Sequence, residues 1–286
     1  MANSEAPIGR LAPSELADAE ALVAASGWNQ VAADWRIFLH LGTVYAVRDG
    51  ARVIATAATL PYGNTCAWIS MVLVSEAYRR RGLATRLLRQ CIDDIVATGG
   101  VPVLDATPAG RTVYRYLGFK DAWGFARLRS AQRTDVPKGV DDQVDVQRIS
   151  DRTWPALCAY DAAVFGLDRR ALLSRMRGRL PAANLFAARE GRIAGLLLGR
   201  EGRTAAHLGP LIAEDDATAL ALLRRALPSL EGNLYIDIAD AKSTVRDALE
   251  ACGFAPQRPF TRMLHGRARS FDDLRRTYAV IGPEFG

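Results

Sequence analysis

The sequence predicts two tandem domains of α/β structure. In each domain we expect a mixed sheet, as in α+β folds, with helices on both of its faces. Apolar residues follow strand-like and helix-like spacing in turn, with strands early and strand–helix–strand units later. Late positions of the first half also recur, at one constant offset, in the second half: Gly118, Phe119, Phe125 and Arg127 against Gly253, Phe254, Phe260 and Arg262. Several matches in one order indicate two copies of a single plan.

Periodicity and turn signals give the elements of the first copy. The alternating pattern breaks at Asp49-Gly50, which is typical of a tight hairpin turn, and Gly99-Gly100 closes a leucine-rich helix. The expected order is a strand near 8–11, a helix over 14–25, a hairpin over 43–62, a strand over 66–74, a helix over 83–98, a strand over 101–107, a helix over 109–117 and a strand over 124–130.

The boundary between the copies is expected in the polar stretch 134–143, where proline, glycine and charged residues replace the apolar pattern. We therefore expect domains at residues 1–137 and 138–286. The chain of 286 residues is long enough for two domains of ordinary size.

Composition excludes several classes of protein. No apolar run approaches the roughly 20 residues that cross a bilayer, and the N-terminus does not read as a signal peptide. The four cysteines are far apart and form no C-x-x-C motif, which argues against a metal site and favours a reducing compartment. We expect a soluble, cytoplasmic protein with no metal and no membrane partner. The net charge of +6 comes almost entirely from arginine, but no basic, aromatic-rich patch predicts a nucleic-acid partner.

One cluster of arginines stands at a junction between a strand and a helix. Arg79, Arg80 and Arg81 follow the strand over 66–74, and Gly82 opens the leucine-rich helix. A helix N-terminus presents unpaired N–H groups and partial positive charge, and so favours anions. The arrangement predicts a cradle for a pyrophosphate. It is neither a Walker A loop nor the G-x-G-x-x-G motif, because it has a single glycine.

The stretch 79–84 matches R-x-x-G-x-A and resembles the acetyl-CoA-binding motif of the Gcn5-related N-acetyltransferase (GNAT) superfamily. Tyr114 precedes Gly118-Phe119 by four residues, as in that superfamily. The whole chain also resembles a tandem subgroup whose C-terminal domain is of the YitH type. The segments that carry this second resemblance are 27–35, 104–114, 164–173, 207–215 and 258–263.

The resemblance implies transfer of an acetyl group from acetyl-CoA to a primary amine of a small molecule, by direct attack on the thioester. It implies two tandem GNAT-like domains, the second degenerate. The implied cofactor-binding residues lie on the strand and the cradle: Val72, Leu73, Val74, Arg79, Arg80, Arg81, Gly82, Leu83, Ala84 and Thr85. A non-catalytic acyl-CoA sensor is the alternative, and the oligomeric state is open.

The resemblance also suggests catalytic residues. Tyr114 would protonate the departing thiolate, although a tyrosine on a helix can equally be a packed aromatic residue. Asp105, at the end of its strand, is the best-placed carboxylate for a general base, or it orients a neighbouring loop. Thr107 stands where relatives often carry an asparagine, so its contact with the cofactor is uncertain.

The acceptor side is expected around a tryptophan-rich segment. Trp28, Asn29, Asp34 and Trp35 lie in the region that lines this side in relatives. Tryptophan beside a carboxylate suits a cationic amine. The same residues also suit an ordinary amphipathic helix.

The second copy departs from the first where the cofactor would bind. Glu214, Asp215 and Asp216 replace the arginines and the glycine, and Leu249 replaces the tyrosine. Carboxylates repel a pyrophosphate, so we expect one active site per chain. The second domain either has a structural role or forms one wall of the acceptor cleft, through 165–170 or through Arg258 and Arg262.

Overall fold

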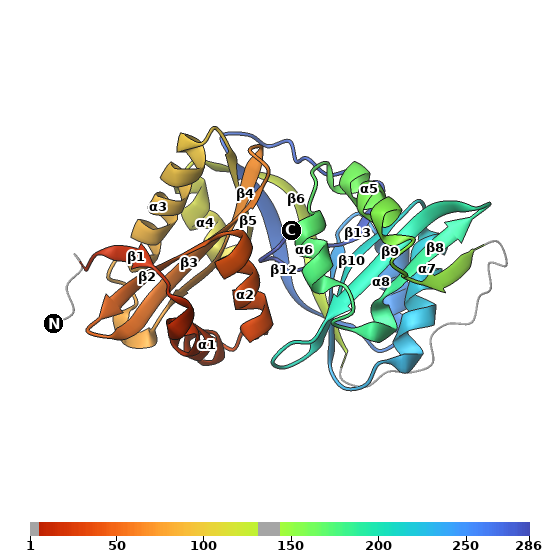
Figure 1. Cartoon of the computed structure of the whole chain (residues 1–286), viewed down its shortest axis with the longest axis horizontal. Coiled ribbons are helices and arrows are strands. Elements are labelled where there is room, and N and C mark those ends of the chain that lie inside the picture. The colour runs from red at the N-terminus through yellow and green to blue at the C-terminus, as the bar shows by residue number, and fades with distance from the viewer. Residues whose placement is uncertain (1–5, 131–143) are drawn as a thin grey trace.

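The protein is described here by a computed structural model that covers residues 6–130, the first half, and 144–286, the second half. The expected boundary at 134–143 lies outside the described residues, so the domain limits stay a prediction. Thirteen strands of the two halves form one continuous sheet, in the order β1-β2-β3-β4-β5-β12-β6-β11-β13-β10-β9-β8-β7. Figure 1 shows an elongated molecule, with the two halves side by side and the C-terminus between them.

The elements expected in the first half are all present, with small differences at their ends. One further helix, α2, contains Asp34 and Trp35 of the tryptophan-rich segment, while Trp28 and Asn29 lie in the loop before it. The elements are β1 (Ile8–Arg10), α1 (Leu16–Ala25) after a 3-10 turn, α2 (Ala32–Leu41), β2 (Thr43–Asp49), β3 (Arg52–Tyr62), β4 (Cys66–Val74), α3 (Leu83–Ala97), β5 (Val101–Ala106), α4 (Pro108–Tyr116) and β6 (Phe119–Ser130).

The second half repeats this order and then adds one strand. Its elements are β7 (Asp145–Arg148), α5 (Trp154–Phe165), α6 (Arg170–Met176), β8 (Leu185–Arg189), β9 (Arg192–Arg200), β10 (Ala206–Ala213), α7 (Asp216–Ala226), β11 (Leu234–Ala239), α8 (Ser243–Ala251), β12 (Ala255–His265) and β13 (Thr277–Ala279). Parallel pairs β4–β5 and β10–β11 stand among antiparallel neighbours. The predicted mixed α/β sheet, built twice, is confirmed.

The two halves exchange their last strands. β12 of the second half pairs with β5 of the first, with Met263 opposite Leu104. β6 of the first half pairs with β11 of the second, with Leu128 opposite Ile236. β6 and β12 also pair with each other along most of their length. Each half therefore needs a strand from the other to complete its sheet, which makes the halves one folding unit.

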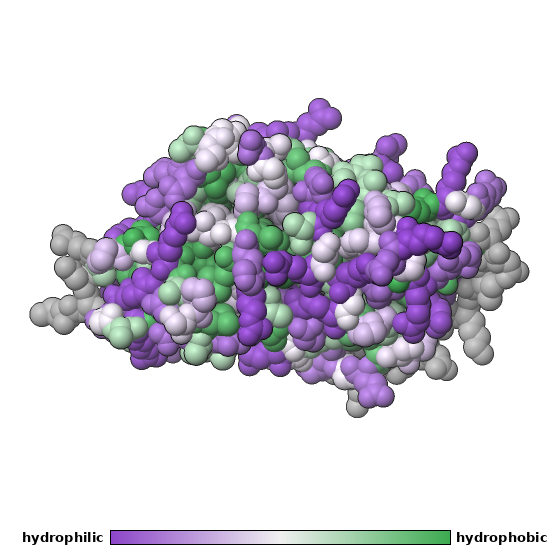
Figure 2. Space-filling model, viewed as in Figure 1, coloured by the Kyte–Doolittle hydropathy of each residue, from purple (hydrophilic) through white to green (hydrophobic). Residues whose placement is uncertain are grey.

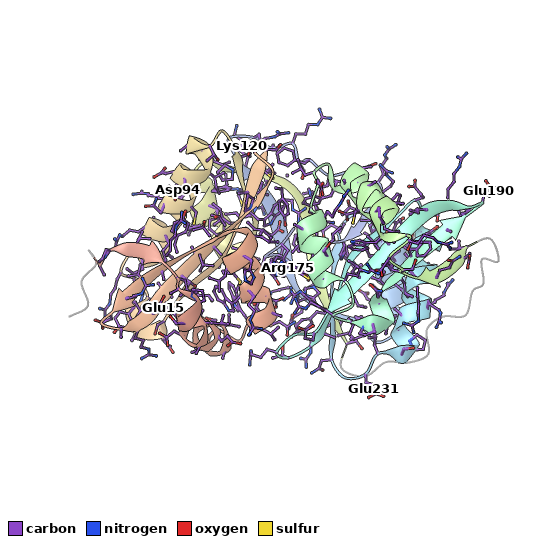
Figure 3. The ribbon with its side chains drawn as sticks, viewed as in Figure 1. Glu15, Asp94, Lys120, Arg175, Glu190 and Glu231 are labelled. Atoms are coloured by element: carbon purple, nitrogen blue, oxygen red, sulfur yellow. The ribbon has the colours of Figure 1, made fainter. Side chains whose placement is uncertain are left out.

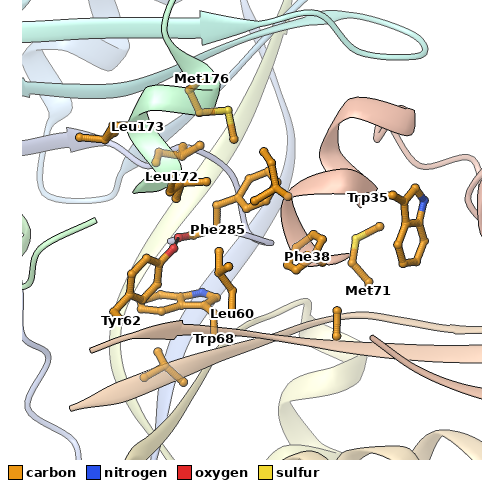
Figure 4. Close-up of a cluster of buried hydrophobic side chains, with 14 of the residues drawn as sticks. Trp35, Phe38, Leu60, Tyr62, Trp68, Met71, Leu172, Leu173, Met176 and Phe285 are labelled. Carbon is orange, nitrogen blue, oxygen red and sulfur yellow. Dashed lines mark hydrogen bonds between the residues drawn. The ribbon is translucent and has the colours of Figure 1, made fainter. Parts of the chain in front are cut away.

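One hydrophobic core joins the halves around Phe285 (Figure 4). The Phe285 ring stacks on Phe38 with ring centroids 5.2 Å apart, and the Tyr62 hydroxyl donates to the Phe285 carbonyl oxygen at 2.5 Å. Leu172 and Met176 of α6 belong to the same core. Burial of a side chain of this size contributes about 1.5–3 kcal/mol, so the C-terminal segment is held firmly against the first half.

On the surface shown in Figure 2, hydrophilic residues cover both halves, and smaller groups of hydrophobic residues are interspersed among them. Arg175 of α6 is exposed and lies near the centre of the view in Figure 3, and its Nη1 is 3.4 Å from His40 Nδ1 of α2. In the described part of the chain, no helix has the length and apolar character needed to cross a membrane.

Candidate active site

The central strands of the first half separate part of the way along. β4 pairs with β5 in parallel only from Cys66 to Trp68. β5 pairs on its other side with β12, from Val103 to Ala106, and no residue of β4 after Trp68 pairs with β5. The rest of β4 is left without a neighbour on that side, and a gap opens between β4 and β5. We call this space the first gap.

A bulge in β4 lies at the start of this gap. Met71 and Val72 together face the single residue Ala57 of β3. Met71 has φ of 51°, and its carbonyl oxygen accepts a hydrogen bond of 2.9 Å from Thr56 Oγ1. Bulges and left-handed residues other than glycine are enriched at functional sites, because they redirect backbone groups at some cost in strain.

A cavity of about 410 Å³ occupies the first gap. Both halves line it: Ser70–Val72 of β4, the loop 28–30, Tyr114 of α4, Arg127 of β6, Arg258 and Phe260 of β12, and Glu284 of the C-terminal segment. The Ser70 hydroxyl is buried and has no hydrogen-bond partner among the described residues. The cavity is therefore a pocket with both polar and apolar lining residues, and the second half helps to build it.

Tyr114 reaches the cavity from α4. Its ring packs edge-on against Phe119 at 6.1 Å, and Gly110 leaves room for it, since a Cβ there would lie 2.8 Å from the Tyr114 ring. No group in residues 6–130 or 144–286 hydrogen-bonds its hydroxyl. Burial raises the pKa of Tyr114, so the hydroxyl stays protonated at neutral pH. Tyr114 thus brings a protonated hydroxyl to the wall of the cavity.

The arginine–glycine turn forms the N-terminus of α3, on the surface beside β4. Gly82 has φ of 77°, a conformation that favours glycine. A Cβ at Gly82 would meet no atom of the described protein within 4 Å, so the backbone angle is what requires glycine within the protein itself. Arg79, Arg80 and Arg81 are exposed, and Arg81 Nη2 donates to the Ala77 carbonyl oxygen at 2.9 Å. The first turn of α3 offers unpaired N–H groups to an anion.

Asp105 lines the cavity, but both of its carboxylate oxygens are engaged. Arg262 of β12 donates to each of them at 2.9 Å, and Arg262 also pairs with Asp272 at 3.0 Å. Burial raises the pKa of the Asp105 carboxyl, and the Arg262 guanidinium opposes that rise. The Asp105 carboxylate thus joins β5 of the first half to β12 of the second half through Arg262. This contact matches the alternative that Asp105 orients its neighbours.

The predicted acceptor residues fall into two groups. Trp28 and Asn29 line the cavity, and Asn29 Oδ1 accepts from the Ala205 N–H at 3.0 Å. Asp34 and Trp35 lie on α2, are fully buried and do not line it. Asp34 instead pairs with Arg179 at 2.7 Å and with Arg200 at 3.0 Å, while Trp35 packs in the core.

Sequence reasoning missed Glu284. Its carboxylate lines the cavity, and its Oε1 accepts from Arg200 in a buried ion pair. No residue in the described ranges hydrogen-bonds Oε2. The segment after residue 265 has no counterpart in the first copy, and that difference is the one signal that could have drawn attention to it.

The second half has an equivalent gap that the chain itself fills. β10 and β11 pair in parallel from Ala206 to Leu208 and then separate. β13 lies between them, with Ala279 opposite both Leu211 and Ile238. The chain therefore occupies the second gap with its own strand.

The acidic residues of the second copy hold this strand in place. Tyr278 donates to Asp216 at 2.6 Å, and Arg276 lies 3.3 Å from Glu214. Asp215 caps α7 by accepting from the Thr218 N–H at 2.8 Å. The carboxylates that replace the cradle thus bind parts of the protein.

No group of three or more His, Cys, Asp or Glu side chains in the described residues could hold a metal ion.

Comparisons with known proteins agree with this geometry. The acetyltransferase (GNAT) family model matches residues 16–119, and an acetyltransferase (GNAT) domain model matches residues 157–279. The chain is 26% identical over 186 residues to an uncharacterized N-acetyltransferase, YitH of Bacillus subtilis. That match covers 65% of this chain and 65% of YitH, slightly less than two thirds of either.

Solved structures share the fold over nearly the whole chain. A putative acetyltransferase from Pyrococcus horikoshii has a TM-score of 0.79 at 19% identity, covering 100% of this chain and 98% of its own. A tandem GNAT protein from the clavulanic acid biosynthesis pathway has a TM-score of 0.67 at 14% identity, covering 91% and 98%. With a GNAT model matching each half, the chain belongs to the GNAT acetyltransferase family as a tandem protein with similarity to YitH.

Proposed function

We propose that the protein is an acetyl-CoA-dependent N-acetyltransferase that acetylates a primary amine of a small molecule, with one active site per chain. The observation that carries the proposal is the open first gap, where the cavity meets the unpaired hydroxyl of Tyr114. The second gap is filled by β13. The four cysteines are free and buried, which supports action in the reducing cytoplasm.

The residues present fit the donor. The N–H groups of the first turn of α3, with Arg79–Arg81 beside them, would bind its pyrophosphate. The unpaired edge of β4 would align its extended arm, and a β4 N–H would stabilise negative charge on the acetyl oxygen. Acetyl-CoA supplies an acetyl group activated as a thioester.

Two side chains would then move the protons. Tyr114 protonates the leaving sulfur. Glu284 holds the acceptor amine and receives its proton, directly or through water, because the amine must be neutral to attack. We assign this role to Glu284 because Asp105 has both oxygens bound by Arg262.

Calorimetric titration with acetyl-CoA tests the proposal. We expect one site per chain, together with transfer to an amine. Gly82→Ala should weaken binding about tenfold, because the left-handed angle costs a side chain about 1–2 kcal/mol and shifts the N–H groups of α3. Gly50→Ala is the matched control: Gly50 has φ of 59° with nothing near its Cβ position, but it lies in the β2–β3 turn.

Three results would count against the proposal. A stoichiometry of two would show that the second gap also binds the donor. Equal weakening by both glycine variants would remove the cradle from the site. Binding without any transfer would favour the acyl-CoA sensor.

A further inference from the structure

Arg258 brings into the cavity a guanidinium with no hydrogen-bonded anion among the described residues. It lies on β12, half-buried, with its guanidinium over the Phe260 ring at 5.0 Å. Its Nε is buried without a hydrogen-bond partner. Within residues 6–130 and 144–286, no carboxylate or carbonyl group pairs with the guanidinium. Buried polar groups are almost always satisfied, so an exception in a cavity wall points to a missing partner.

A second arginine lies next to Arg258. The Arg127 guanidinium is over the same Phe260 ring, 5.5 Å from its centroid, and donates two hydrogen bonds of 2.8 Å to Asp237. Burial and the Arg127 guanidinium lower the pKa of Arg258, and the carboxylates of Asp237 and Glu284 oppose this decrease. A buried cation beside another cation is costly unless an anion joins it.

The donor does not supply that anion at its phosphates. None of residues 79–85, where its pyrophosphate would bind, lines the cavity. Arg258 instead shares the cavity with Trp28 and with Glu284, which has one carboxylate oxygen unbound. The acceptor end thus offers one guanidinium for an anion and one carboxylate for an ammonium group.

Building on the proposed acetyltransferase activity, we propose that the acceptor is a small amino acid, whose carboxylate pairs with Arg258 and whose amino group lies at Glu284. A planar guanidinium binds a carboxylate through two parallel hydrogen bonds, which favours this anion. The cavity of about 410 Å³ must also admit the acetyl end of the donor, and this restricts the acceptor to a small molecule.

Equilibrium binding to the full chain saturated with CoA tests the inference without turnover. The probes are glycine, β-alanine, 4-aminobutyrate, alanine and glutamate, each compared with its carboxamide. We expect at least one amino acid to bind about tenfold or more tightly than its amide. Arg258→Gln should reduce that preference to about twofold or less, and Arg258→Lys should retain part of it. Arg129→Gln, an exposed arginine on neighbouring β6, should leave it unchanged.

Thermal unfolding separates binding from folding. Arg258→Gln removes no hydrogen bond or ion pair among the described residues and relieves the repulsion between Arg258 and Arg127, so the variant should unfold at the wild-type temperature or above it. A preference that survives Arg258→Gln, amides that bind as well as the acids, or no binding by any probe would overturn the inference. If the proposed acetyltransferase function is wrong, the protein should fail to bind CoA, which is a separate result. Binding of the same amino acids and carboxamides, measured without CoA, would still show whether Arg258 selects a carboxylate.

Discussion

The two gaps of the sheet begin alike and end differently. In each half, two parallel strands pair over three residues and then separate, from Trp68 in the first and from Leu208 in the second. The first gap stays open as a cavity, while the second is closed by β13. One plan, used twice, has therefore given a binding site and an internal clamp.

A feature that both copies share is expected to serve the fold, whereas a feature found in one copy alone is a candidate for function. Arg262 pairs with Asp105 across the strand exchange, and Arg127 pairs with Asp237 at the equivalent place. Because the ion pair also exists around the closed gap, it does not depend on catalysis. Tyr114 has no such counterpart, since Leu249 stands there as a buried core residue. This comparison supports the proposal that Asp105 is a positioning residue and that Tyr114 is the proton donor.

The largest effect on stability is expected from a substitution in the C-terminal segment after β13, which runs from the second gap to the first. Phe285 is fully buried in the core of the first half, so Phe285→Ala should lower the free energy of unfolding by about 3–5 kcal/mol. Denaturant unfolding measures the change. Leu274→Ala, at an exposed position before β13, is the control and should cost less than about 0.5 kcal/mol. Similar costs for both would mean that the C-terminal segment does not tie the halves together.

A second experiment tests which feature makes the open gap catalytic. Tyr114→Phe removes the proton donor and keeps the ring against Phe119, so kcat should fall about 100-fold while the Kd for acetyl-CoA changes little. Steady-state kinetics and titration measure the two quantities. Tyr116→Phe is the matched control, since Tyr116 is 87% exposed on the same helix. An unchanged kcat in Tyr114→Phe would remove the tyrosine from the mechanism.

Local sequence signals predicted much of the fold of the first half. The Asp49-Gly50 turn, the apolar strand over 66–74 and the leucine-rich helix from residue 83 appear as expected, because each depends on residues close in sequence. The loss of the second cradle was also visible, in Glu214–Asp216. The exposed position of Arg79–Arg81, just before α3, also follows from the local order of strand, polar turn and helix.

Long-range pairing could not be predicted in this way. The exchange of β6 and β12 joins strands that are far apart in sequence, and nothing in either strand specifies its partner. Asp34 looked like an acceptor-site carboxylate because its partners, Arg179 and Arg200, lie in the other half. Glu284 was missed for the same reason, since its place in the cavity depends on the path of the chain after β13.

The smallest effect concerns the clamp in the second gap. Burial, and then the hydrogen bond to Asp216, raise the pKa of Tyr278 above its ordinary value of about 10. The stabilising contribution is present below pH 10 and is lost as pH rises further, because the unfolded tyrosine ionises first. Tyr278→Phe should therefore be less stable than wild type by about 1 kcal/mol at pH 8, through the lost hydrogen bond, and the difference should shrink above pH 10. Denaturant unfolding of both proteins at pH 8 and again above pH 10 measures this difference in stability. A difference that stays constant with pH would mean that the carboxylate replacing the cofactor cradle does not hold β13 through this hydroxyl.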